Sequence, residues 1–565
     1  MVNLQERFDE LEKLARAAGL DPYDVHFFHV PASIIYEIAS YGLPTRYSHW
    51  TFGRMYQRQK TQGEMGMSKI YELVINNNPS YAFLDKNNTD TINLLIAAHV
   101  LGHADYFKNN IMFKRCGETS MIDQAKRHAD FIDECRKDFG NDEVDSILDI
   151  SLSMERHIDV YKGLHRDRYP DRHIEYEDRT ATEWEDIVHV KGGKKPLVNK
   201  TIKGLYLPPY PEKDLLWFIS EYANLEPWQK KIFEIVRRES YYFYPQYRTR
   251  IANEGWAAYH HAELMRQYAY GNNNDLGVTG LKYPLTSEEH MEFVSHHEKV
   301  VQPGLKIPLK ITYVDPTGKK VKKWNPAITS NPRLFRLATQ LNPYYVGFRI
   351  YRDIKKRWDK YFEDGYREDE YGNEIPVIIN GDQKIREVMI NSDDVSLMRN
   401  YLTQDLADEL KLFYYGNTDN FEDNYEFQEE EMVDEKEGST DSDISDQTIK
   451  NKTVIVRSKD IKEIIKAFAK DHNNYGVPEI VVRRVDENGL LRLEHLLNDG
   501  VNVDINYTKQ VLRYIWKVWS RPVELVRKGS KVTWHITYDG LSYEIDHETP
   551  DYPEIIEEGS APSSW

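Results

Sequence analysis

The stretch that decides the fold is LLIAAHVLGHADYF, residues 94–107. Its apolar residues predict a largely buried helix. His99 and His103 are four residues apart, so both imidazoles lie on one helix face about a turn apart. Two imidazoles placed in this way can chelate one metal ion. The alternative is that both histidines are hydrogen-bonded residues of an apolar core.

A second informative string is NEGWAAYHH at residues 253–261, within a segment (241–271) that predicts a long helix. Glu254 and His261 are seven residues apart and share a helix face, whereas His260 is six residues on and less well aligned. A carboxylate in so apolar and aromatic a helix is costly unless a cation or a metal ion pairs with it. A buried ion pair with a nearby arginine is the alternative to metal ligation.

Together the two helices resemble the gluzincin arrangement, in which an HExxH helix supplies two histidine ligands and a later helix supplies a glutamate. Some gluzincin-like peptidase families carry that glutamate in an EGWAxY string, which matches residues 254–259. The resemblance implies that His99, His103 and Glu254 bind a divalent metal ion. Zinc is the first choice for this ion, and iron and manganese are the alternatives.

One position departs from the gluzincin pattern. Val100 stands where those enzymes have the glutamate that acts as general base. Without a base, water activated by zinc has no proton acceptor. Glu72, Glu118 and Glu155 are the carboxylates that could replace it, with Glu72 and Glu155 as the chosen catalytic residues. If none does so, the protein is not a peptidase.

Other histidines can enlarge the ligand set. His157 lies on a predicted helix and His260 lies next to the Glu254 face, so both are candidate ligands. Five ligands are too many for one tetrahedral zinc ion, and a set that large suits two metal ions, or non-haem iron or manganese. His296 and His297 precede Glu298 on a helix with surface character and are expected to be exposed.

Composition limits the class of protein. A chain of 565 residues predicts two or more domains. Its net charge of −18 opposes non-specific binding to nucleic acid or to anionic lipid. Two cysteines cannot form a disulfide framework, and no signal peptide or membrane span is recognisable. We therefore expect a soluble cytoplasmic protein.

The pattern along the chain predicts a mainly α domain at residues 1–416, with the gluzincin-like helices inside it, and a small α+β domain at 451–548. Between them, residues 417–450 predict a flexible acidic linker, since Phe421–Asp446 contains twelve acidic residues and one lysine. Residues 549–565 predict a disordered tail.

Individual elements are predicted by hydrophobic period and turn residues. Loops or short strands are expected from Asp21 to Thr89, where Pro, Gly and Asn cluster. The α+β domain is expected to contain a strand at 452–458 and hairpins at 479–497 and 522–540, the first with an Asn-Gly turn. Helices are expected at 1–20, 90–114, 120–139, 142–164, 214–223, 227–240, 241–271, 286–301, 344–361, 393–414, 460–470 and 507–519.

Several long strings resemble the SpoVR family, the stage V sporulation protein R family of bacteria. The strings are YGLPTRYSHWTFGR (41–54), YELVINNNPSYAFL (71–84), AAHVLGHADYFKNN (97–110), FYPQYRTRIANEGWAAYHHAELM (243–265), LNPYYVGFRIYRDIKKRW (341–358) and LRYIWKVWSRPVEL (512–525). The resemblance runs from residue 1 to about residue 545. It implies a part in sporulation, in spore cortex formation, and a serine protein kinase of the same pathway as a partner.

Three functions remain open at this point. The first is a metal-dependent hydrolase acting on an amide or peptide bond, with a peptide or peptidoglycan-like substrate. The second is a non-enzymatic regulatory or assembly protein that binds partners through its C-terminal domain. The third is a non-haem iron or manganese enzyme.

Overall fold

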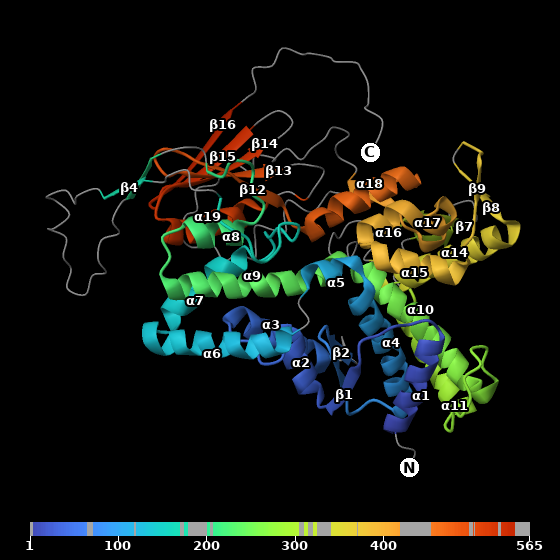
Figure 1. The fold of residues 1–565 in the computed structure, drawn as a ribbon. Coiled ribbons are helices and arrows are strands. Elements are labelled where there is room, and N and C mark those ends of the chain that lie inside the picture. Colours follow the sequence, from blue (N-terminus) through green and yellow to red (C-terminus); the bar gives the residue numbers. More distant parts are fainter. Residues whose placement is uncertain are drawn as a thin grey trace. The chain divides into compact units, whose positions relative to one another are not determined.

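The structure is a computed structural model. It describes residues 4–64, 72–117, 120–169, 175–178, 200–203, 207–303, 310–314, 320–324, 341–369, 371–417, 454–496, 501, 503–528 and 533–548. The chain groups into two compact units, and each unit combines two separate stretches of sequence (Figure 1). Unit 1 comprises Met1–Asp145 and Arg238–Tyr475, and unit 2 comprises Ser146–Arg237 and Gly476–Trp565.

The core of unit 1 is a set of packed helices. Helix α10 (Arg250–Ala269) contacts both α4 (Asp90–Asn109) and α14 (Pro343–Asp364), and α1 (Leu4–Ala17) and α11 (Ser287–Val300) pack on α4 (Figure 1). Helix α4 buries almost all of its side chains, as the apolar sequence predicts for a helix covered on every side. The two motif helices are therefore neighbours.

Glycines set the distances between these helices. A Cβ atom added at Gly102 of α4 would lie 2.7 Å from Ala257 Cα of α10. A Cβ atom added at Gly347 of α14 would lie 2.6 Å from Gly255 Cα, again on α10. Neither position has room for a methyl group, so α10 is held against both neighbours at backbone contact.

Replacing Gly347 by alanine is expected to destabilise the protein by about 1–3 kcal/mol, because the new methyl group overlaps backbone atoms that cannot move aside. Thermal denaturation measures the effect. Gly53→Ala is the matched control, since its Cβ meets nothing within 4 Å and it lies in helix α3 (Trp50–Glu64). That variant should gain about 0.5–1 kcal/mol. Equal melting temperatures for Gly347→Ala and wild type would contradict the packing described here.

A small sheet with strand order β1-β3-β2 packs beside these helices in unit 1. Its strands are β1 (Val25–Val30), β2 (Glu72–Ile75) and β3 (Ser80–Asp85), with β1 parallel and β2 antiparallel to β3. Short strands were expected in this region, but α2 (Ala32–Tyr41) and α3 were not. Periodicity missed α2 because its first residue follows Pro31 without a side-chain cap.

The other elements of unit 1 are α5 (Ile111–Cys116), α6 (Met121–Phe139), the short η2 (Gly271–Asn273), β6 (Lys310–Val314), β7 (Lys320–Trp324), β8 (Tyr366–Glu368), β9 (Glu374–Pro376), α15 (Gly381–Asn391), α16 (Asp394–Tyr401), α17 (Gln404–Leu410), β10 (Tyr414–Asn417), β11 (Val454–Ser458) and α18 (Ile461–His472). The residues of α7 (Asn141–Ser153), α9 (Pro227–Arg248) and η3 (Asn473–Gly476) are divided between the units. Helix α9 runs eight residues beyond its predicted end at Ser240 and includes Pro245 in its last turn.

Unit 2 contains a five-stranded sheet of order β12-β13-β14-β15-β16. The strands are β12 (Glu479–Val485), β13 (Leu491–Leu496), β14 (Val523–Lys528), β15 (Thr533–Tyr538) and β16 (Tyr543–Glu548). Strands β13 and β14 are parallel, and α19 (Ile505–Trp519) connects them and packs on β14 and β15. Both predicted hairpins are confirmed. Unit 2 also holds α8 (Leu215–Tyr222) and the paired strands β4 (Glu175–Asp178) and β5 (Lys200–Lys203).

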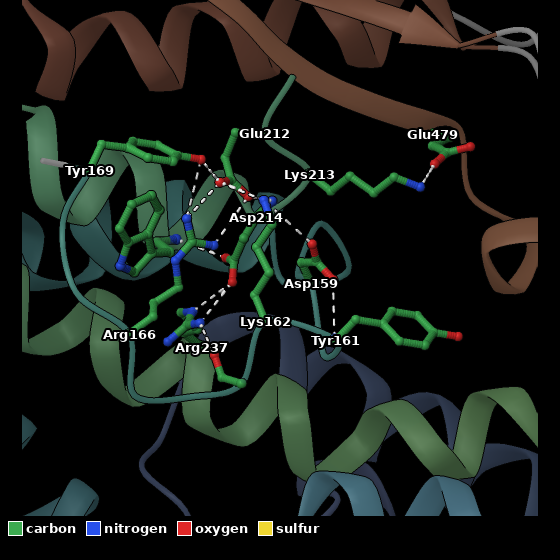
Figure 2. Close-up of polar contacts among 12 residues, drawn as sticks. Asp159, Tyr161, Lys162, Arg166, Tyr169, Glu212, Lys213, Asp214, Arg237 and Glu479 are labelled. Atoms are coloured by element: carbon green, nitrogen blue, oxygen red, sulfur yellow. Dashed lines mark hydrogen bonds and ion pairs between the residues drawn. The ribbon is translucent and has the colours of Figure 1, made fainter. Parts of the chain in front are cut away.

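A buried carboxylate organises the segment of unit 2 that precedes α8. Figure 2 shows Glu212 surrounded by cationic and hydroxyl groups. Arg166 Nη2 lies 2.6 Å and Lys162 Nζ 3.0 Å from its Oε2, and the Tyr169 hydroxyl donates to the same oxygen. The Glu212 backbone exchanges two hydrogen bonds with Val482 of β12. The carboxylate thus ties the 162–169 segment to the edge of the sheet.

This network predicts a pH-dependent contribution to stability. Burial raises the pKa of Glu212, but hydrogen bonds from Arg166 and Tyr169 outweigh it and lower that pKa from 4.5 to about 2. Because the pKa of Glu212 is lower in the folded protein, its ionised carboxylate stabilises the fold. This contribution, about 3 kcal/mol, is fully present above pH 4.5 and is lost as the pH falls through 2. The stability difference between wild type and Glu212→Gln, followed by urea denaturation, should therefore shrink from pH 5 to pH 2. A stability difference between the two proteins that does not change with pH would contradict this prediction.

The predicted fold class is confirmed at a coarse level, as a mainly helical protein with a small sheet-containing C-terminal region. The predicted domain boundaries at 416 and 451 divide the chain differently from the two units and stay a prediction. Apart from Asn417, the predicted linker at 417–450 lies outside the described residues, as does the predicted tail. No helix in the described part of the chain is both long enough and apolar enough to cross a membrane.

Candidate metal centre

Three side chains of unit 1 converge at the contact between α4 and α10. His99 Nε2 lies 3.3 Å and His103 Nε2 3.4 Å from the same atom, Glu254 Oε2. One ligand atom from each residue lies within 4.8 Å of the other two. Across the described ranges, these residues form the one such group of His, Cys, Asp or Glu side chains suited to hold a metal ion.

Local sequence explains this convergence. The i, i+4 spacing places the two imidazoles one turn apart on α4, with ring centroids 4.5 Å apart. Helix α10 approaches at Gly102, where no side chain separates the two backbones. Glu254 lies less than one turn before Ala257, the contact residue of α10, and therefore reaches across to both histidines.

Hydrogen bonds on the far side of each ring orient the ligand atoms. His103 Nδ1 lies 3.0 Å from Asn253 Oδ1, a carbonyl oxygen that can only accept, so His103 donates from Nδ1. A neutral His103 then presents the Nε2 lone pair to Glu254. His99 Nδ1 lies 3.0 Å from His261 Nδ1, which leaves His99 Nε2 to face the same carboxylate.

Two distances within the group bear on its chemistry, because metal ligands and hydrogen-bond partners differ in their typical spacing. A charged N–H···O hydrogen bond is typically about 2.7–2.9 Å long. The two distances to Glu254 Oε2, 3.3 and 3.4 Å, exceed this range. They match the edges of a tetrahedron around zinc, which are about 3.4 Å for zinc–ligand bonds of about 2.0–2.2 Å. These two distances therefore fit ligand atoms around one cation, and His99 Nε2 also lies within long hydrogen-bond range of Glu254.

The group is largely buried and includes a carboxylate that stays ionised. The two histidine side chains are 4% and 5% exposed, while Glu254 is 21% exposed, so solvent reaches the group from the Glu254 side. Burial raises the pKa of Glu254, but the interactions with His103 and His99 outweigh it and hold that pKa well below its usual range. Rings cover the histidines, since Tyr344 stacks on His99 and Phe107 on His103.

Comparison with known proteins identifies the family. A family model described as "SpoVR like protein" matches residues 1–438. The chain belongs to the SpoVR family. The resemblance predicted from the sequence strings is thereby confirmed, and the matched region of this SpoVR chain contains His99, His103 and Glu254. The chain is also similar to "Uncharacterized protein YcgB" of Escherichia coli (strain K12). The two are 26% identical over 543 residues, which cover 92% of this SpoVR chain and 91% of that protein. No solved structure matches.

His260, chosen from the sequence as a ligand, is not part of the group in this SpoVR protein. Six residues after Glu254 correspond to about 240° around a helix, so His260 points to another face of α10. Its ring centroid lies 4.2 Å from that of Trp256 and 5.2 Å from that of Tyr259. Burial, with a smaller effect of Arg386, lowers the pKa of His260 to about 3.

His261, which the sequence places on the face of Glu254, was not chosen as a candidate ligand. Seven residues correspond to about 700°, or almost two full turns, so His261 shares the face of Glu254 and its ring contacts His99. Its Nε2 lies 2.7 Å from His297 Nδ1 on α11. The expectation that His297 is exposed was wrong, since its ring is half-buried against His261 and Phe348.

The remaining predicted site residues stay predictions. Glu72 is the first residue of β2, and Glu118 lies outside the described residues. Glu155 and His157 belong to unit 2, where Leu215 N donates to the His157 carbonyl and burial lowers the pKa of the His157 ring to about 4. Val100, at the position of the gluzincin base, is a fully buried core residue of unit 1.

Proposed function

We propose that His99, His103 and Glu254 bind one divalent metal ion, zinc in the first instance, and that the site hydrolyses an amide or peptide bond. One observation carries the proposal: the Nε2 atoms of His99 and His103 lie 3.3 and 3.4 Å from the same Glu254 oxygen, a spacing that fits ligands of one zinc ion. Two histidines and one glutamate are the protein ligands of the gluzincin type of catalytic zinc site.

The number of ligands favours catalysis over a structural role. Structural zinc sites have four protein ligands, whereas catalytic sites have three and keep one position for water or substrate. The described residues supply three, and Glu254 is the most exposed of them. A zinc ion in such a site lowers the pKa of bound water and polarises a carbonyl group.

The general base is the second part of the proposal. Because Val100 cannot accept a proton, a carboxylate from another element must do so. Glu72 is our first candidate, because strand β2 contacts α4 in the same unit as the triad. Glu155 is the second candidate.

The family resemblance supports the wider biological setting of the proposal. It implies a part in spore cortex formation in the cytoplasm, a serine protein kinase as partner, and a peptide- or peptidoglycan-like substrate. These assignments rest on the resemblance and not on the geometry of the triad.

The test is hydrolysis of peptides and peptidoglycan fragments by protein loaded with one equivalent of zinc. We expect His103→Ala to lose both zinc and activity. Glu72→Gln should retain zinc and lose about 100-fold or more in kcat, as expected for removal of a general base. Zinc-loaded wild type that cleaves no amide substrate would contradict the hydrolase proposal.

Val100 favours a second function, that of a non-enzymatic regulatory or assembly protein that acts through partner binding. In that case wild type binds zinc without hydrolysing amides, and a His103→Ala variant that still folds keeps its partners. A non-haem iron or manganese enzyme is distinguished by visible absorption and by a requirement for oxygen.

A further inference from the structure

Three histidines on three helices form a continuous chain that begins at the metal triad. His99 Nδ1 on α4 lies 3.0 Å from His261 Nδ1 on α10. His261 Nε2 lies 2.7 Å from His297 Nδ1 on α11. Both contacts have hydrogen-bond length, and both ring nitrogens of His261 are engaged by other histidines.

A neutral imidazole has one N–H donor and one acceptor nitrogen, so the donors along this chain are not independent. If His99 presents a lone pair at Nε2, its proton is on Nδ1 and is donated to His261 Nδ1. The proton of His261 is then on Nε2 and is donated to His297 Nδ1. If the hydrogen bonds run in the opposite direction, the proton of His99 is on Nε2. There it points at Glu254 and prevents His99 from binding a metal ion through that nitrogen.

We propose that His261 and His297 are positioning residues that hold His99 in the tautomer able to bind metal through Nε2. This inference rests on the proposed metal site and extends it to a residue on α11. In known metal sites the second ring nitrogen of a ligand histidine donates to an outer partner, and loss of that partner costs 10–100-fold in affinity. Here a histidine takes the place of the usual carboxylate or carbonyl.

The buried surroundings of the three histidines limit them to the two proton arrangements described above. His261 is 2% exposed, so water does not compete for its nitrogens. The His297 ring is in contact with Phe293 and Phe348, with ring centroids 5.9 and 5.5 Å away. Since His297 is only half-buried, its outer nitrogen is the point at which the chain approaches the surface of α11.

His260 provides a matched control. It is adjacent to His261 on the same helix and is 6% exposed, but among the described residues neither of its ring nitrogens has a hydrogen-bond partner. Replacing either histidine by phenylalanine removes a buried imidazole and retains a ring. Only the change at His261 removes a contact to His99.

The experiment measures zinc affinity by competition with a chelator in His261→Phe, His261→Asn, His297→Phe and His260→Phe. We expect His261→Phe to weaken zinc binding by about 10–100-fold. In His261→Asn the introduced side-chain oxygen can accept from His99 Nδ1, so this variant should recover most of the loss. His297→Phe should give a smaller loss, and His260→Phe none.

Histidine side-chain NMR adds a readout that a purely structural role would not change. Zinc-loaded wild type should show the His99 proton on Nδ1 and the His261 proton on Nε2. If His261→Phe does not fold, His297→Phe still tests the inference, because position 297 is only half-buried. Zinc affinity of His261→Phe or His297→Phe equal to that of His260→Phe would overturn the inference. Wild type that binds no zinc would instead overturn the proposed metal site.

Discussion

Glu254→Gln is expected to abolish stoichiometric zinc binding, with an affinity more than about 100-fold below that of wild type. The substitution keeps the size of the side chain but removes the negative charge that His99 and His103 share. Loss of an outer partner of a zinc ligand costs 10–100-fold, and loss of a ligand should cost more. Elemental analysis after gentle purification, followed by chelator competition, measures the effect.

The control for this prediction is Glu263→Gln on the same helix. Glu263 bonds to Arg266 and Gln267 and takes no part in the triad. Its variant should bind zinc as wild type does. Equal zinc contents in Glu254→Gln and Glu263→Gln would show that Glu254 is not a ligand.

Glu212→Gln is expected to destabilise unit 2 by about 3–5 kcal/mol. The carboxylate is fully buried and is bonded by Arg166, Lys162 and Tyr169 (Figure 2). Neutralising it removes the carboxylate that Arg166 and Lys162 share, while Lys162 keeps Asp159 at 3.7 Å. Removing one charge of a buried ion pair is costly because the partner charge stays buried. Denaturation by urea at pH 7, with the spectroscopic signal of unit 2 followed separately, measures the loss.

An exposed ion pair of the same unit serves as the comparison. Glu234 pairs with Lys231 at i, i+3, and both side chains are about half exposed. Glu234→Gln should change stability by no more than about 0.5 kcal/mol. A Glu212→Gln variant as stable as Glu234→Gln would mean that the network in Figure 2 contributes nothing to folding.

Local periodicity predicted most of the elements but not their assembly. The Asn-Gly hairpin and the helix carrying His99 were recognisable because their patterns are contained within about twenty residues. The meeting of His99 with Glu254, 155 residues apart, was reached only through the gluzincin resemblance. Gly102 was a local signal of the close contact between the two motif helices.

The choice among neighbouring histidines shows a second limit of prediction from the sequence. Helix geometry already favoured His261 over His260, because seven residues return to the starting face and six do not. His260 was nevertheless kept as a candidate ligand because it lies next to the Glu254 face. The grouping of His157 and Glu155 with unit 2 depends on contacts between distant segments, which no local pattern contains.

The most direct test of the central claim is anomalous X-ray scattering at the zinc edge, from crystals of the full chain purified with zinc. We predict one strong peak at about 2.0–2.2 Å from His99 Nε2, His103 Nε2 and Glu254 Oε2. A fully loaded protein whose zinc peak lies elsewhere, or a chain that takes up no zinc in solution, would contradict it.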